Sequence, residues 1–170
     1  MMGKCFWLMA LALFFGQAAG PAWGQTVGGS GTPPAAPPAA AQAEKDILHL
    51  NTIGAFSAGF VLQSYGYIGV LADVMSQEVY PADLVRDMLG ETINYMRNVN
   101  GQLLKYHSGP PIAPGDLEFI SAIMEIINYL IVEAESLSSF ARTKSKDDLQ
   151  RYEEARRNAW KSIKKTFNVK

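Results

Sequence analysis

Cysteine is almost absent from this sequence, which contains a single one, Cys5, close to its start. The first residues resemble a cleaved export signal, as argued below, so the mature chain would contain no cysteine. That absence excludes disulfides, thiol catalysis, thiolate metal sites and CxxCH haem attachment in the mature protein. It also suits an oxidising compartment, where unpaired thiols are a liability.

Catalytic motifs are missing as well. The sequence has no GxSxG, no phosphate-binding loop and no Gly-rich strand-to-helix turn. The serines Ser57, Ser64 and Ser121 have no base beside them that would activate a hydroxyl. We therefore predict that the protein is not an enzyme and needs no cofactor. The net charge is only −1, so there is no electrostatic case for nucleic-acid binding.

One long stretch lacks charge completely. No Lys, Arg, Asp or Glu occurs from Ile47 to Ala72, although Asp46 and Asp73 flank this run. An uncharged helix of that length has to be buried, either in protein or in lipid. Polar residues such as Asn51 and Gln63 favour a central helix of a soluble bundle. A membrane-spanning helix over 47–72 is the alternative.

The N-terminal residues 1–24 are typical of a secretory signal peptide. Lys4 gives the positive start, residues 6–15 form a short apolar run, and residues 22–24 include the small residues that a signal peptidase reads. We expect cleavage before Gln25, with cleavage after Ala19 or Gly20 as the competing choice. The protein is therefore predicted to be secreted or periplasmic.

Low-complexity sequence follows from residue 25 to residue 43, made largely of Gly, Pro and Ala. Such a segment has no apolar side chains to bury and is predicted to be a disordered linker. The remaining residues, 44–170, form one domain, and at 48% apolar residues the chain can fill a hydrophobic core.

Three breaks divide this domain into four predicted helices. The first helix runs from Ile47 to about Ser76, and the second begins at Pro81. The second ends in the Gly-Pro segment 108–111, after which the third starts near Pro114. A capping box at residues 145–148 opens the fourth. Short connections predict an all-α, antiparallel up-down-up-down four-helix bundle with coiled-coil-like packing, and no alternating run competes as a strand.

Two apolar surfaces exceed what one bundle needs. Beside its main stripe, the third helix has a second one, which we predict to be a dimer interface and which contains Phe119, Ile123, Ile126 and Leu130. The first helix has a smooth face of small residues, namely Ala55, Gly59, Gly66 and Gly69. We expect this smooth face to be absorbed by close packing inside the monomer.

Charge is divided unevenly between the last two helices. Residues 116–135 contain five acids and no base, whereas residues 144–170 contain nine Lys or Arg and four Asp or Glu, a net of +5. Complementary packing of neighbouring helices is the simplest explanation. Contact of the basic fourth helix with an anionic membrane surface is the alternative.

Two histidines lie beyond the predicted linker. His49 is near the start of the first helix and His107 is at the end of the second, which an antiparallel bundle places at the same end. Asp116 and Glu118 begin the third helix there, so His49 and His107 are candidate metal or haem ligands. Because the sequence has no HxxxH and no ExxH, we favour ordinary helix-end residues.

These patterns predict an exported, non-catalytic binding, scaffold or accessory subunit. We expect a homodimer or a complex with an unidentified protein partner. The alternatives are a periplasmic metal- or haem-binding bundle and a membrane-associated protein. A helical bundle by itself implies no particular function.

Overall fold

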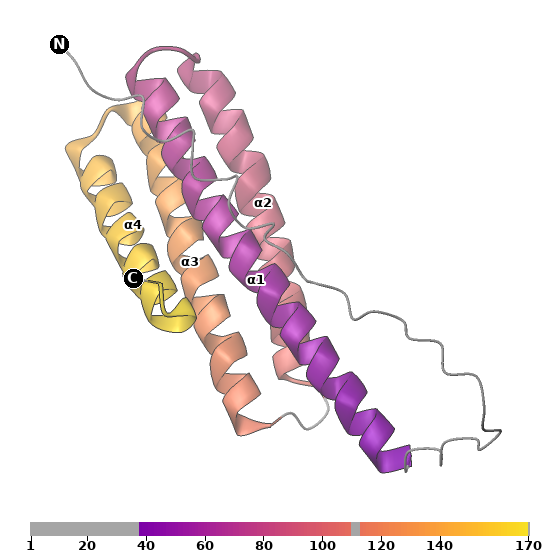
Figure 1. The fold of residues 1–170 in the computed structure, drawn as a ribbon. Helices are drawn as coiled ribbons and strands as arrows, with labels where there is room; N and C mark the ends of the chain where they lie inside the picture. The colour runs from indigo at the N-terminus through magenta and orange to yellow at the C-terminus, as the bar shows by residue number, and fades with distance from the viewer. Residues whose placement is uncertain (1–37, 110–112, 170) are drawn as a thin grey trace, which may run out of the picture. The chain divides into compact units, whose positions relative to one another are not determined.

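The computed structural model describes residues 38–109 and 113–169, which form four helices and, within these ranges, no strand. The helices are α1 (Pro38–Ser76), α2 (Ala82–His107), α3 (Pro114–Thr143) and α4 (Lys146–Phe167). Consecutive helices run in opposite directions (Figure 1). The prediction of an all-α four-helix domain is confirmed. The predicted signal peptide lies outside the described residues, as does most of the predicted linker.

Helix α1 begins earlier than the sequence suggested. It starts at Pro38, so residues 38–43 of the predicted linker are helical. Proline fits the first position of a helix, and the alanines after it have the highest helix propensity. Composition had suggested disorder, but this run of residues also has good helix formers.

The joint between α3 and α4 is two residues long. Lys144 adopts the left-handed conformation with φ 56°, and the Ser145 hydroxyl accepts a hydrogen bond of 3.2 Å from the Asp147 backbone N–H. Ser145 is thus the predicted N-cap. The Asp148 carboxylate accepts hydrogen bonds from Thr143 Oγ1 (2.7 Å) and from a second hydroxyl near the end of α3 (2.8 Å), and both lower its pKa. These bonds tie the end of α3 to the first turn of α4.

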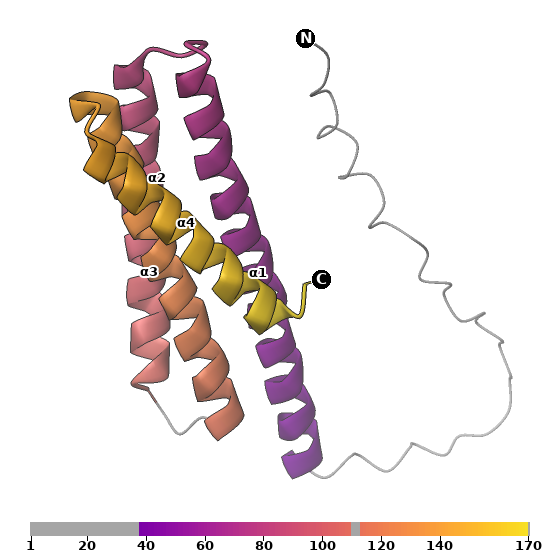
Figure 2. The same cartoon turned by 90° about the vertical axis from the view of Figure 1, so that its left-hand side faces the viewer.

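Helix α3 is the centre of the bundle. It packs against each of the other three helices, whereas α2 and α4 make no close backbone contact in the part of the chain that the structure describes. Figure 2 shows α4 crossing obliquely over the other helices. The fully buried large apolar side chains of α3 are Ile120, Ile123, Ile126, Ile127, Leu130 and Leu137. Three neighbours explain why α3 has two apolar stripes.

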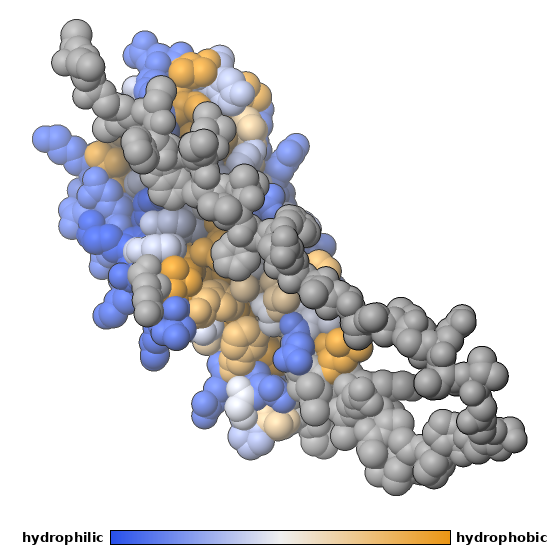
Figure 3. Space-filling view, in the orientation of Figure 1, coloured by the Kyte–Doolittle hydropathy of each residue, from blue (hydrophilic) through white to orange (hydrophobic). Residues whose placement is uncertain are grey.

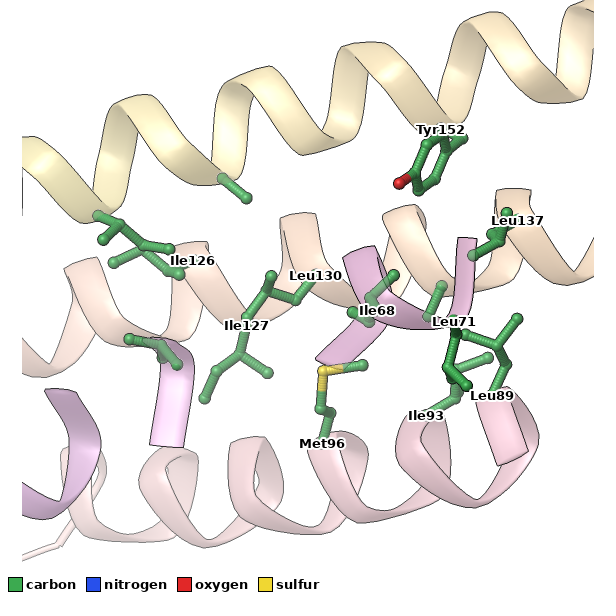
Figure 4. Close-up of a cluster of buried hydrophobic side chains, with 14 of the residues drawn as sticks. Ile68, Leu71, Leu89, Ile93, Met96, Ile126, Ile127, Leu130, Leu137 and Tyr152 are labelled. Carbon is green, nitrogen blue, oxygen red and sulfur yellow. The ribbon is translucent and has the colours of Figure 1, made fainter. Parts of the chain in front are cut away.

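The dimer surface predicted on α3 needs correction. Ile123, Ile126 and Leu130 are 0–1% exposed within a single chain, and Figure 4 shows Ile126 and Leu130 between α4 and the side chains of α1 and α2. Phe119 is partly buried and packs edge-on against Phe167, with 6.2 Å between ring centroids. The second stripe is part of the monomer core, so it offers no open surface to a second copy.

Helix α1 is less buried than the sequence predicted. It was predicted to be the buried central helix, yet only 22% of its most apolar window is buried. It buries Val61, Ile68 and Leu71 but exposes 76% of Phe56. By length and composition, residues 51–76 are long and apolar enough to cross a membrane. The smooth face was expected to be packed, but part of it faces outward.

Candidate functional site

A groove lies between residues 53–67 of α1 and residues 91–106 of α2. Its largest part is a depression of about 670 Å³, and a second part of about 530 Å³ continues on the other side of Tyr95, which lines both. We call this feature the α1–α2 groove. It is lined from α1 by Ile53, Ala55, Phe56, Gly59, Phe60, Gln63, Ser64 and Tyr67. It is lined from α2 by Glu91, Thr92, Tyr95, Asn98, Val99, Gln102, Leu103 and Tyr106.

Side-chain size explains why the groove stays open. The α2 residues that line it recur every three or four positions and therefore share one face of that helix. Opposite them, α1 presents small residues, and a Cβ added to Gly59 would meet no atom within 4 Å. Phe60 and Tyr95 bridge the groove edge-on, with 5.4 Å between ring centroids. The space beside Ala55 and Gly59 is thus left unfilled between the larger side chains of α1.

The groove is apolar and almost free of charge. Helix α1 contributes no charged residue to it, and α2 contributes only Glu91. Phe56 and Tyr95 are 76% and 61% exposed. Ser64 is 7% exposed and lines the groove, yet its hydroxyl has no hydrogen bond among those of the described residues. Exposed aromatics around a hollow with a single charged residue are typical of a surface that binds an apolar partner.

Figure 3 shows how the two sides of the molecule differ. The side over α4 is mostly hydrophilic, whereas hydrophobic residues gather along the middle of the face in view. The exposed bases of α4 include Lys161, Lys164 and Lys165. The basic surface and the apolar groove therefore involve different helices.

A buried ion pair lies between α3 and α4. The Glu133 side chain is fully buried, and its Oε1 accepts a 2.6 Å hydrogen bond from Arg156 Nη1. Burial raises the pKa of Glu133 to about 7, although the Arg156 guanidinium acts in the opposite direction. The second carboxylate oxygen, Oε2, is buried without a hydrogen-bond partner in the structure. This pair joins an acid of α3 to a base of α4, as the uneven charges of the two helices suggested.

The same arginine holds α1 in place. Arg156 Nη1 donates to the Tyr65 backbone carbonyl at 3.2 Å, and the guanidinium lies 4.1 Å from the centre of the Tyr65 ring. That ring stacks on Trp160, with 5.3 Å between ring centroids. A Cβ added to Gly69 would lie 2.5 Å from Arg156 Nη2, so a larger residue there would require the guanidinium to shift. These contacts fix the rotation of α1 and thereby the face that it turns outward.

The predicted histidine site has one described side chain. His107 Nε2 lies 3.2 Å from Ser121 Oγ, and this contact links the end of α2 to α3. The prediction that no base lies beside Ser121 is therefore wrong. His49 belongs to α1, but its side chain lies outside the described part. The side chains that the structure does describe include no group of three His, Cys, Asp or Glu that could hold a metal ion. The metal alternative stays a prediction.

Sequence reasoning missed the buried pair, although a signal was present. Glu133 occupies the one position of the second α3 stripe, between Leu130 and Leu137, where an apolar residue would continue the spacing. An acid in the middle of an apolar stripe needs a partner when the stripe is buried. Its partner on α4 had no comparable signal, because Arg156 lies among many other bases.

Comparison of the chain with protein families, with curated proteins and with solved structures finds no match.

Proposed function

We propose that this protein is an exported, non-catalytic binding or accessory bundle whose α1–α2 groove takes an apolar helix of a protein partner. The observation that carries this proposal is the 76% exposure of Phe56 beside a hollow of about 670 Å³ whose only charged lining residue is Glu91. Soluble monomers rarely expose large contiguous apolar patches without a binding role. The sequence offers no catalytic motif that would compete with a binding role.

The dimensions of the groove suit a helix. The α2 residues that line it run from Glu91 to Tyr106, which corresponds to about 22 Å at 1.5 Å per residue. A partner helix of about four turns would cover that length, and helix-in-groove binding uses apolar anchors on one face. Phe56 and Tyr95 would contact such anchors.

Export is part of the proposal and has its own test. The apolar run of residues 6–15 after Lys4 supports a cleaved signal peptide. N-terminal sequencing of the protein recovered from outside the cytoplasm should give a start between Gly20 and Thr26. Exported protein that still begins at Met1 would contradict cleavage.

Site-specific photo-crosslinking tests the groove. A photoreactive amino acid in place of Tyr95 should give a covalent adduct to a protein in the cell that exports the chain. The same substitution at Leu104 is a matched control, since Leu104 is a 53% exposed apolar residue of α2 that does not line the groove. The absence of any adduct from Tyr95, or equal adducts from both positions, would refute the proposal.

A membrane-associated protein is the second candidate, and one observation favours it. Residues 51–76 satisfy the length and hydropathy of a membrane span. In the bundle, however, the charged Arg156 donates to the carbonyl of Tyr65 in the middle of this segment. A guanidinium at that depth favours the bundle over a bilayer. Recovery of the exported protein in the membrane fraction would support the second candidate.

A further inference from the structure

The outward face of α1 alternates between large and small residues. Phe56 and Tyr67 are 76% and 38% exposed, while Ala55, Gly59 and Gly66 are exposed positions with little or no side chain. A Cβ at either glycine would meet no atom within 4 Å. Aromatic projections and open hollows therefore lie on one helix face, without a charged residue between them.

The alternation of large and small residues on this face is self-complementary when two copies of α1 run antiparallel. Consider a two-fold axis perpendicular to α1 at the level of Val61, which pairs residues at equal distances before and after that position. Phe56 then faces Gly66 of the other helix, and Tyr67 faces Ala55. The exposed aromatics Phe56 and Tyr67 each meet a small residue, while Leu62 meets Phe60 close to the axis. Such reciprocal contacts are what a two-fold interface requires.

We propose that the occupant of this face is a second copy of the chain, with the two α1 helices packed antiparallel about the level of Val61. This inference deepens the proposed binding function and depends on it, because it names the partner of the same surface. Small residues let the two backbones approach, and the aromatic side chains of each copy enter the hollows of the other. Oligomers of identical chains most often have this symmetry.

The exposed area is consistent with a stable dimer. At about 200 Å² for an aromatic side chain, the exposed fractions of Phe56, Tyr67 and Tyr95 leave roughly 350 Å² open to solvent. Leu62 and Val70 on the same side of α1 are 40% and 56% exposed and add to this area. A standard interface buries about 800 Å² per partner. A few side chains thus provide about half of that requirement before the groove floor is counted.

Polar groups at this face also favour a second copy. Ser64 is 7% exposed and lines the groove. In the antiparallel register, Gln63 of the other copy faces Gly59, about one and a half helical turns from Ser64. The Gln63 amide can both donate and accept, so it suits hydroxyl groups at this face. Gln63 is exposed and lines the groove, which explains why a polar residue interrupts this apolar face.

The charges at the rim disfavour an anionic membrane as the occupant. Glu91 lines the groove, and Asp73 and Asp87 are exposed acids on the same two helices. An apolar face that binds anionic lipid is normally flanked by Lys and Arg. The nearby Arg86 is paired with Asp83 at 2.9 Å. The basic residues of this protein concentrate on α4 instead.

Sedimentation of the full exported chain over a range of concentrations tests the dimer. The native protein should be a dimer, and Phe56→Glu should raise the dissociation constant at least about 30-fold, as loss of an aromatic hot spot does. The variant should keep its helical circular dichroism, because Phe56 is mostly exposed. The control Leu104→Glu should leave the dimer intact. A native monomer at high concentration, or a Phe56→Glu variant that dimerises normally, would overturn the proposal.

Engineered cysteines test the register. In a Cys5→Ser background, the pair Phe56→Cys and Gly66→Cys should form intermolecular disulfides, while Phe56→Cys alone should not. The two positions lie about 15 Å apart along one helix, too far for an internal bridge. Crosslinking by the single variant would indicate a parallel arrangement and overturn the antiparallel one.

The photo-crosslinking experiment separates the two proposals. An adduct from Tyr95 with twice the mass of the chain supports both the groove and the second copy. An adduct with a different protein leaves the proposed function standing but overturns the second copy. A monomeric native protein that binds phosphatidylcholine vesicles assigns the face to lipid and overturns both.

Discussion

Substitution of Glu133 by Gln should change how stability depends on pH. The folded chain binds the proton of this buried carboxyl more tightly than the unfolded chain, because its pKa rises from 4.5 to about 7. Between these pH values the folded state therefore holds more protons than the unfolded state. The free energy of unfolding must fall as pH rises through this window.

The size of the effect follows from the same pKa values. Each pKa unit corresponds to about 1.4 kcal/mol, so ionisation of Glu133 should remove about 3 kcal/mol of stability between pH 4.5 and pH 8. Glutamine cannot ionise, and it keeps an oxygen that can accept from Arg156. The Glu133→Gln variant should therefore gain about 3 kcal/mol relative to the native protein over this range.

Urea denaturation followed by circular dichroism at several pH values measures this difference. Glu135→Gln is the matched control, since Glu135 is an acid of the same helix with a 42% exposed side chain that pairs with Arg97. Its substitution should change stability by less than about 1 kcal/mol. If the difference between native protein and Glu133→Gln is independent of pH, or grows in favour of the native protein at high pH, then the reasoning about burial is refuted.

Three further substitutions test other parts of the structure. Gly66→Ala should stabilise the monomer by up to about 1 kcal/mol in urea denaturation, whereas Gly69→Ala should destabilise it by about 1 kcal/mol because its methyl group would shift the Arg156 guanidinium that bonds Glu133. Leu130→Glu should unfold the domain, as judged by loss of helical circular dichroism, because the carboxylate would be buried in the core without a partner. Replacing both His49 and His107 by Gln should leave metal content at background in elemental analysis, and stoichiometric metal lost from this variant would instead support the metal-binding alternative.

Helix positions followed from local chemistry and were largely predictable. Pro81 precedes α2, Pro114 begins α3, and Ser145 caps α4, as the sequence indicated. Each of these signals acts within one turn of the helix that it starts, so the sequence alone reveals it. The start of α1 at Pro38 was missed because Ala-rich sequence suits both a flexible linker and a helix.

The arrangement of the helices in space was harder to predict. The lack of charge from residue 47 to 72 was interpreted as burial, and the second stripe of α3 was interpreted as a dimer surface. The structure shows the opposite burial, because α3 packs closely against α2 and α4, whereas α1 touches the other three helices only loosely and leaves one side open. Periodicity tells which residues share a face, but it does not tell how many helices pack against that face. The groove between α1 and α2 depends on this arrangement and was therefore missed.

The weak burial of α1 has a consequence for the order in which the bundle opens. Helices α3 and α4 are joined by two residues and share hydrogen bonds at their junction. Helix α1, in contrast, buries few large side chains and leaves one side exposed to solvent. Amide hydrogens of α1 should exchange with solvent through partial openings that leave the α3–α4 pair intact. Release of the Tyr65 carbonyl from Arg156 would be part of each opening. The helix that presents the groove is thus also the first cooperative unit to detach.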